Sequence, residues 1–336
     1  MTTAAAVDVS TSDRPDLATQ ARRWAQRNSW TLALLALFAA ILLITYLIQP
    51  SYGAAQLQGL AIGALPLAMA TVAQAIVVIS GGIDLSVGSM MALTSVTAAV
   101  LMKGQSEAFA VPVVIGVLVL GLILGIINGT LVVITRVPDI VVTLAMTFVW
   151  AGAALVVLHS PGGGSVDWLR GLVTGSIGSE WIPRALLTLL VIVAVIWIPL
   201  RRSSAGLALY AVGSNRLAAF RSGVPVGRTK VFAYVLGGLF SAFGGLALTA
   251  TTGIGTPVPG AYTLLGVAAV VLGGVSLAGG RGGIAGPIVA VFVLALVRTD
   301  LTLVGVNSNL STVIQGAILI GVVMFGSLLT LRRART

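Results

Sequence analysis

Long apolar runs, separated by one or a few charged residues, make up most of the chain. A membrane-spanning helix needs about 20 apolar residues and tolerates charge poorly at the bilayer centre, so each charge-free run corresponds to one span or two. The runs that hold two spans are 28–83 and 231–280. The runs that hold one span are 85–102, 108–135, 140–166, 185–200, 282–297 and 301–331. The pattern predicts an all-α polytopic membrane protein with about ten transmembrane helices in a single domain, residues 30–331.

The composition agrees with this prediction and narrows the chemistry. Of the 336 residues, 57% are hydrophobic and only 8% are charged, whereas a soluble domain has about 25% charged residues. Cysteine is absent and His159 is the only histidine, which excludes thiolate metal sites and histidine clusters within one chain. We therefore expect neither a metal nor a cofactor on this chain.

Basic residues are distributed unevenly between the two ends of the predicted helices. If the N-terminus lies in the cytoplasm, all but four of the 19 lysines and arginines fall on the cytoplasmic side. The four on the outer side are Lys103, Arg170, Arg184 and Arg298. Both termini are then cytoplasmic, and the net charge of +10 reflects membrane topology, with no nucleic-acid partner needed to explain it. Residues 1–29 are polar and predict a disordered cytoplasmic tail, and residues 332–336 form a second, short tail.

The longest predicted cytoplasmic loop, residues 201–230, contains several basic residues and no acidic one. Within it, Ser214 can cap a short helix over residues 216–222. Gly223 and Pro225 would end that helix. The loop therefore predicts a helix of about two turns at the membrane surface.

One face of this short helix is apolar, because the spacing of Leu217, Phe220 and Val224 places them on the same side. Such a face can dock a soluble partner, or it can anchor the helix among lipid headgroups. The glycine and alanine residues nearby favour docking, since small side chains let another backbone approach closely.

Two glycine-rich breaks interrupt the apolar runs and resemble each other. "VVISGGIDLSVG" at 77–88 and "VVLGGVSLAGG" at 270–280 each combine an apolar helix, a glycine pair and a short leucine-containing break. Repeats of this kind commonly flank the substrate path of a transporter. We expect a weak internal repeat, with broken helices near Gly81-Gly82 and Gly273-Gly274.

Polar side chains in the apolar runs must find partners or line water. The candidates for a translocation path are Gln74, Asp84, Asn128, Thr143, Thr147, Trp150 and Gln315. Trp150 beside Thr147 places an aromatic face next to a hydroxyl, which suits a hydroxyl-rich solute. For Asp84 the alternative is a structural cap, shared with Ser86, at the start of the next helix. For the others the alternative is hydrogen bonding between packed helices.

Four motifs then occur in a fixed order: "ISGGIDLSVGSMMALTSVTAA", "NGTLVVITRVPDIVVTLAMTFVWAGAAL", "YAVGSNRLAAFRSGV" and "AAVVLGGVSLAGGRGGIAGPIVA". Over about residues 60–330 the chain resembles the permease subunits of ribose-type ABC importers. The resemblance implies a multi-pass protein of the bacterial cytoplasmic (inner) membrane. It implies as partners a second permease chain, identical or paralogous, a cytoplasmic ABC ATPase subunit and an external solute-binding protein. The implied cargo is a sugar or a related small polyol.

The same resemblance implies a role for the short cytoplasmic helix. In such permeases the corresponding helix fits a cleft on the ATPase. The residues that match it here are Gly213, Asn215, Ala218, Ala219 and Gly223, and Leu217 joins them through its place on the apolar face.

The chain departs from the family pattern at three places. Asp139 stands where phenylalanine is usual. Thr263 follows Tyr262 where an acidic residue is common, and Arg298-Thr299 replaces a frequent Asn-Gly pair. These departures leave the identity of the sugar open.

Other function classes fit less well. The segment "GVPVGRTK" at 223–230 lacks the spacing and the Gly-Lys-Ser/Thr ending of a phosphate-binding loop, so ATP would be hydrolysed by a partner and the chain is not itself an enzyme. A secondary transporter usually needs a carboxylate at mid-membrane, whereas Asp84, Asp139 and Asp300 lie at the ends of runs. A permease for branched-chain amino acids, a stand-alone secondary transporter, and a membrane enzyme or structural subunit remain as alternatives.

Overall fold

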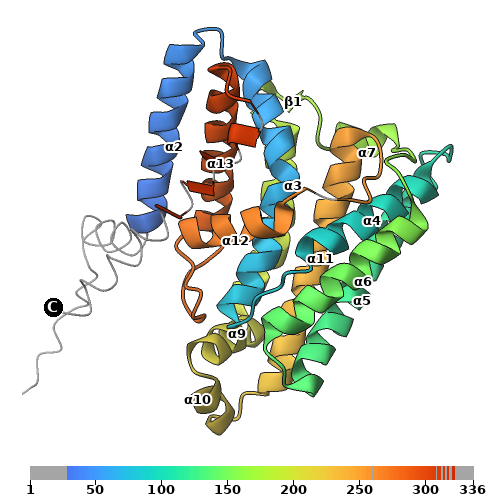
Figure 1. Cartoon of the computed structure of the whole chain (residues 1–336), viewed down its shortest axis with the longest axis vertical. Helices are drawn as coiled ribbons and strands as arrows, with labels where there is room; N and C mark the ends of the chain where they lie inside the picture. The colour runs from blue at the N-terminus through green and yellow to red at the C-terminus, as the bar shows by residue number, and fades with distance from the viewer. Residues whose placement is uncertain are drawn as a thin grey trace, which may run out of the picture.

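The structure is a computed structural model that describes residues 29–258, 260–307, 309–311, 313–314, 316–317 and 320–321. The predicted tails therefore lie outside the described residues, apart from Ser29. The described part is helical almost throughout, as Figure 1 shows. Its named strands form one short antiparallel hairpin, β1 (Ser176–Ile177) with β2 (Ser179–Pro183).

Seven of the helices are long and apolar enough to cross a membrane. They are α2 (Ser29–Ile48), α3 (Ala54–Ile79), α5 (Ala110–Thr135), α6 (Asp139–Val157), α8 (Arg184–Arg202), α11 (Val226–Thr252) and α13 (Ala285–Leu303). Shorter helices lie between them: α4 (Val87–Met102), α7 (Asp167–Gly171), α9 (Ser204–Ser214), α10 (Arg216–Arg221) and α12 (Tyr262–Leu272). The expectation of an all-α polytopic membrane protein is confirmed. The predicted span 301–331 lies mostly outside the described residues.

Two of the predicted spans are short helices beside the glycine breaks. Helices α4 and α12 have 16 and 11 residues, or about 24 and 17 Å at 1.5 Å per residue. Both lengths are below the hydrocarbon thickness of about 30 Å. The predicted breaks are present: α3 ends at Ile79, two residues before Gly81, whose φ is +75°, and α12 ends two residues before Gly274, whose φ is +82°.

Helix α3 runs through the centre of the molecule and is buried along most of its length. On one side of it lie α2, α12 and α13, and on the other side lie α4, α5, α6 and α11 (Figure 1). Helix α11 is the second buried helix and packs most extensively on α5. The two backbones touch there, because a methyl group added at Gly125 would overlap the carbonyl of Tyr234. Small residues at such crossings are typical of packing in membranes.

The N-terminal helix is tied to the last third of the chain. Trp30 Nε1 donates a hydrogen bond of 2.8 Å to the carbonyl of Leu272, the last residue of α12. The Trp30 ring also lies against Gly274. Helix α2 packs lengthwise on α13, including an edge-to-face contact between Phe38 and Phe292 with ring centroids 6.4 Å apart.

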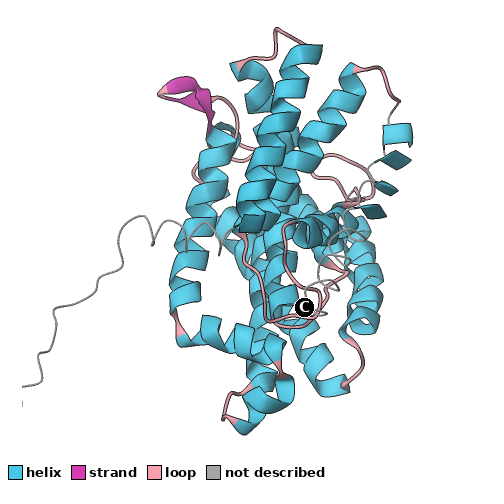
Figure 2. Cartoon of the chain, turned by 90° about the vertical axis from the view of Figure 1, so that its left-hand side faces the viewer, coloured by secondary structure: helices cyan, strands magenta, loops and turns pink. Residues whose placement is uncertain are grey.

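Different elements lie at the two ends of the bundle. One end carries α9 and α10, and the opposite end carries the β hairpin (Figure 2). At the α10 end, Gly280 donates a backbone hydrogen bond of 2.9 Å to Ile79. At the hairpin end, Gly162 and Gly255 pair through their backbones. The α10 end is the one predicted to be cytoplasmic, and this orientation stays a prediction.

Candidate functional site

The segment from Ile83 to Ser86, between α3 and α4, is the meeting point of most of the predicted path residues. Asp84 is fully buried, and its Oδ1 accepts hydrogen bonds from Ser86 N at 2.8 Å and Ser86 Oγ at 2.6 Å. Asp84 thus closes the turn that leads into α4, with Ser86 at the N-cap position. Its second oxygen, Oδ2, is buried and has no hydrogen-bond partner among the described residues.

Helices α5 and α6 reach this segment through Asn128 and Trp150. Asn128 Nδ2 donates to Ser86 Oγ at 2.7 Å. Trp150 Nε1 donates to Asn128 Oδ1 at 3.1 Å. All three side chains are largely buried, so the amide of Asn128 bridges α4, α5 and α6.

Two threonines of α6 bond the backbone of the same segment. Thr143 Oγ1 accepts from Leu85 N at 3.1 Å, and Thr147 Oγ1 donates to Leu85 O at 2.9 Å. Five predicted residues therefore form one network that holds the broken segment against two helices. This geometry matches the alternative in which such side chains join packed helices.

The remaining predicted path residues lie elsewhere. Gln74 lies in α3 with its side chain 1% exposed, and neither of its amide atoms has a hydrogen-bond partner in the part of the chain that the structure describes. Gln315 lies outside the described residues. The role of both in a path stays a prediction.

Three chain segments meet at Gly213, the penultimate residue of α9. A methyl group at Gly213 would overlap the carbonyl of Ile79, and the backbone N of Gly280 would lie 2.6 Å from it. Gly81 also packs against the Gly213 backbone. Direct backbone contacts thus join the glycine break after α3, the loop after α12 and the loop that carries α10. Only glycine permits this contact at position 213, because any side chain would overlap the Ile79 carbonyl.

Helix α10 is capped by Asn215, whose Oδ1 accepts from Ala218 N at 2.9 Å. The prediction that Ser214 is the cap is wrong, because α9 continues through Ser214 and leaves the capping position to the next residue. At the other end, Gly223 adopts a φ of +82°, and Val224 N bonds to Ala219 O at 3.0 Å. This left-handed residue ends the helix.

The apolar face of α10 is divided between solvent and protein. Leu217 and Phe220 are 58% and 68% exposed. Ala219 is buried in a small cluster with Val212 and Val226, and Val224 packs against that cluster. Leu217 and Phe220 therefore form an exposed patch, which we call the α10 patch, and Val224 fixes the helix to the bundle.

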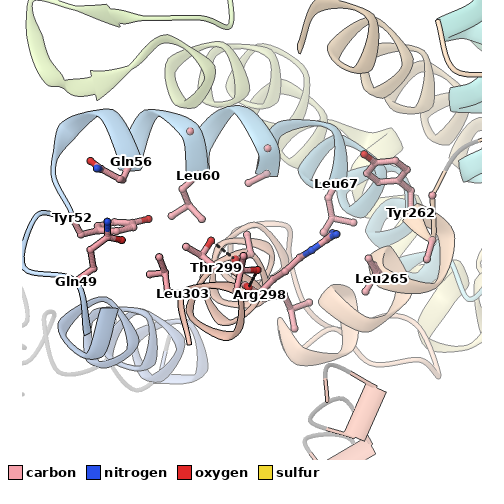
Figure 3. Close-up of a pocket in the computed structure, with 18 residues that line it drawn as sticks. Gln49, Tyr52, Gln56, Leu60, Leu67, Tyr262, Leu265, Arg298, Thr299 and Leu303 are labelled. Carbon is pink, nitrogen blue, oxygen red and sulfur yellow. Dashed lines mark hydrogen bonds between the residues drawn. The ribbon is translucent and has the colours of Figure 1, made fainter. Parts of the chain in front are cut away.

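A cavity with a volume of about 550 Å³ lies between α3, α12 and α13, in the half of the bundle nearer the hairpin end. Figure 3 shows side chains from α3 and α13 that project towards one another across it. Its polar lining residues are Gln49, Tyr52, Gln56, Tyr262, Arg298, Thr299 and Thr302. Leucines such as Leu60, Leu67 and Leu265 make up much of the apolar wall. The cavity is of a size that holds a small polar solute.

Sequence reasoning missed this cavity. Its polar residues lie near the ends of predicted spans, where polar side chains are ordinary, and although Tyr262 and Arg298-Thr299 were noted among the departures from the family pattern, nothing in the sequence indicated that they line one cavity. Gly59 and Gly63 offered a weak signal: they lie one helical turn apart on α3 and line the cavity, and a methyl group at either would meet nothing within 4 Å.

Comparison with known proteins identifies the family. The model of the family described as "Branched-chain amino acid transport system / permease component" matches residues 56–323. The chain belongs to this permease family. It is accordingly the permease component of an ABC transporter, a multi-pass membrane protein whose family members work with ATPase and binding-protein partners.

Several curated proteins are similar over most of their length. The "Probable ABC transporter permease protein y4mJ" of Sinorhizobium fredii is 37% identical over 77% of this chain and 78% of its own. The "Autoinducer 2 import system permease protein LsrD" is 30% identical in Escherichia coli, over 91% of this chain and 94% of its own. The protein of the same name in Salmonella paratyphi B is 31% identical over 92% and 94%. No solved structure matches the chain.

Proposed function

We propose that this permease imports a sugar or a related small polyol, which an external binding protein delivers and a separate ATPase subunit drives inward. The observation that carries the proposal is the cavity between α3, α12 and α13, which combines amide and hydroxyl groups with two tyrosine rings. Hydroxyl-rich solutes are bound by such groups together with an aromatic face. The similarity to permeases named for autoinducer 2 import supports a small-molecule cargo.

The α10 patch would receive the ATPase. Leu217 and Phe220 are exposed, and the helix that carries them is linked through Gly213 to the end of α3. ATPase closure could therefore move the break at Gly81-Gly82 without an intervening flexible linker. The competing role, an anchor among lipid headgroups, requires no partner.

Gln74 extends the path inward from the cavity. It follows Leu67 by seven residues, so it lies two turns further along α3 on the cavity-facing side. Thr71 lies between the two residues on the same helix face, but its hydroxyl already donates to Leu67 O at 2.7 Å, whereas the buried amide of Gln74 has no partner among the described residues. A passing solute would supply its missing hydrogen bonds.

The assembly contains two permease chains, identical or paralogous, in the bacterial cytoplasmic membrane with both termini inside. Residues 1–29 and 332–336 are cytoplasmic tails, and residues 201–230 are the loop that couples the permease to the ATPase. The family description favours one alternative, import of branched-chain amino acids.

Reconstitution of the permease with its ATPase and binding protein in proteoliposomes tests the function. We expect ATP-dependent accumulation of at least one radiolabelled pentose, hexose or polyol, and no accumulation of leucine, isoleucine or valine. Accumulation of a branched-chain amino acid with no sugar or polyol transported would assign the alternative. Accumulation without ATP would contradict the ABC mechanism.

A further inference from the structure

The cavity is positively charged at one end. Arg298 is the one charged side chain among the described residues that line it. Among the described residues, one ion pair is present, and it joins Lys230 and Asp139. No carboxylate of those residues therefore lies within 4.0 Å of the Arg298 guanidinium. Figure 3 shows the Arg298 side chain extending along the cavity towards Leu67 and α12.

The start of α12 adds to this positive potential. Gly260, Ala261 and Tyr262 line the cavity, so the N-terminus of this 11-residue helix opens onto it. The N-cap residue is Ala261, whose side chain caps no backbone N–H, and Tyr262 N already donates to Gly260 O at 2.7 Å, so the helix contributes its dipole and not the N–H of Tyr262. Helix N-termini favour negative charge and commonly bind oxyanions. The helix and Arg298 therefore favour the same kind of ligand group.

The side chains that line the other end of the cavity are polar and uncharged, and the nearest carboxylate, that of Asp300, is close to Tyr52 but does not line the cavity. Gln49, Tyr52 and Gln56 line this end. Tyr52 is 8% exposed, and its Oη is buried without a hydrogen-bond partner among the described residues. Figure 3 shows its hydroxyl end directed into the space between α3 and α13. A buried hydroxyl without a partner is destabilising, and a hydroxyl of a ligand would supply the missing bond.

We propose that this cavity binds a polyhydroxylated solute with a terminal oxyanion, that is, a sugar carboxylate or a sugar phosphate. Arg298 binds the oxyanion, the dipole of α12 favours its charge, and Tyr52 with the neighbouring amides binds hydroxyl groups. The proposal rests on the proposed import function and narrows its solute class. A phospholipid headgroup carries the same oxyanion chemistry, so the experiment separates the two sources.

Equilibrium binding to the purified complex of permease and ATPase in phosphatidylcholine nanodiscs tests the proposal. The probes are radiolabelled D-ribonate, an open-chain five-carbon carboxylate, and D-ribose, a neutral and mainly cyclic sugar of the same carbon number, so the change of preference in the Arg298 variants isolates the effect of the carboxylate. We expect D-ribonate to bind at least tenfold more tightly than D-ribose. Arg298→Gln should remove this preference, and Arg298→Lys should retain part of it. Tyr52→Phe should weaken both sugars by a similar factor.

Lys103→Gln is the matched control, since it removes one exposed positive charge that does not line the cavity. It should leave the preference unchanged. Equal binding of the two probes by the wild type, or an unchanged preference in Arg298→Gln, would overturn the proposal. Retention of phosphatidylglycerol by the wild type but not by Arg298→Gln, with no preference for D-ribonate, would assign the site to a lipid headgroup and also overturn it.

The outcome is distinguishable from failure of the proposed function. ATP-driven uptake of a neutral sugar by the full system, without any preference for D-ribonate, would refute the oxyanion site and leave the importer intact. Absence of ATP-driven uptake of every sugar, polyol and sugar acid tested, D-ribonate included, would refute the function, whatever the binding result.

Discussion

Lys230 Nζ lies 2.8 Å from Asp139 Oδ2 and joins the start of α6 to the start of α11. Tyr234 Oη donates to the same carboxylate at 2.8 Å. The two charged side chains are only 8% and 15% exposed. A methyl group at Gly82 would lie 2.6 Å from Asp139 Oδ2, so the ion pair also lies against the glycine break. Charge pairing thus holds three segments together at the predicted cytoplasmic end.

Removing one member of this pair should destabilise the protein. Lys230→Met leaves a buried carboxylate without its cation, and Asp139→Asn leaves a buried ammonium, each at a cost of about 3–5 kcal/mol. The double variant Asp139→Asn/Lys230→Met should recover much of that loss, because neither charge then remains. Thermal unfolding of the purified permease in detergent measures the effect. Arg228→Met, on an exposed residue of the same helix, is the control, and single variants as stable as it would contradict the prediction.

Gly213→Ala should disrupt the contact between α9 and the end of α3. The added methyl group overlaps the Ile79 carbonyl, which is backbone and cannot rotate away, so the cost should be about 1–3 kcal/mol. The uptake rate should fall by more than the loss of folded protein explains, because the same contact joins the α10 loop to the break at Gly81. Gly152→Ala, in α6 with open space around the new methyl, should change neither. The unfolding temperature and the uptake rate of both variants, measured on the same preparations, test this prediction.

Leu217→Asp should prevent the ATPase from docking. The substitution places a charge in the α10 patch, where an unpaired desolvated charge costs about 3 kcal/mol or more, a factor of at least 100 in affinity. The permease should still insert, because α10 lies outside every spanning helix. Co-purification of the tagged ATPase gives the readout.

Ser222→Asp provides the comparison for the docking test, since it adds the same charge at an exposed position just after α10 and outside the patch. It should co-purify with the ATPase as the wild type does. If Leu217→Asp also assembles and transports normally, α10 is a lipid anchor.

Gln74→Leu should slow transport without weakening the fold. The two lost amide atoms have no partner among the described residues, so an apolar side chain of similar size should be neutral or stabilising. If Gln74 serves the path, the uptake rate should fall about tenfold, the loss expected when roughly 1.4 kcal/mol of transient hydrogen bonding disappears. An unchanged uptake rate with increased stability would show that Gln74 is only a packing residue.

Cysteine labelling tests the orientation of the membrane spans. The chain has no cysteine, so single substitutions report cleanly. Ser179→Cys in the exposed hairpin should react with an impermeant maleimide in intact cells, and Ser222→Cys should react only after permeabilisation. The reverse pattern would invert the topology. Gly163 is a poor site for this test, because its φ is +85° and a methyl group there would meet the backbone of Ala99.

The sequence predicts the helices well because the membrane imposes a strong rule: apolar length decides what can span. The same rule locates the breaks at Gly81 and Gly274, where glycine and polar residues interrupt that length. It cannot predict how long each helix is beside a break, so α12 is shorter than a span. Residue type also failed to locate the cap of α10, since Ser214 and Asn215 are both good caps and the end of α9 decides between them.

The site was harder to predict, because its geometry depends on contacts between distant segments. Asn128 and Trp150 were selected as polar groups within apolar runs, and the structure places them in one network with Ser86. Their residue types do not reveal whether they face a helix or a cavity. Tyr52 and Arg298 are 246 positions apart in the sequence and line one cavity only because α3 packs on α13.

The hydrogen bond from Trp30 to Leu272 has a consequence for biogenesis. Helix α2 is synthesised more than 200 residues before α12, whose Leu272 accepts the hydrogen bond, and α13, on which α2 packs. Until those helices enter the bilayer, α2 must remain in contact with lipid or with the insertion machinery. Its mean hydropathy of 2.6 makes α2 stable in the bilayer before the later helices are made, because lipid solvates an apolar helix. A ribosome that stalls before residue 262 would therefore leave an inserted but unassembled first helix, a form that quality-control proteases can recognise.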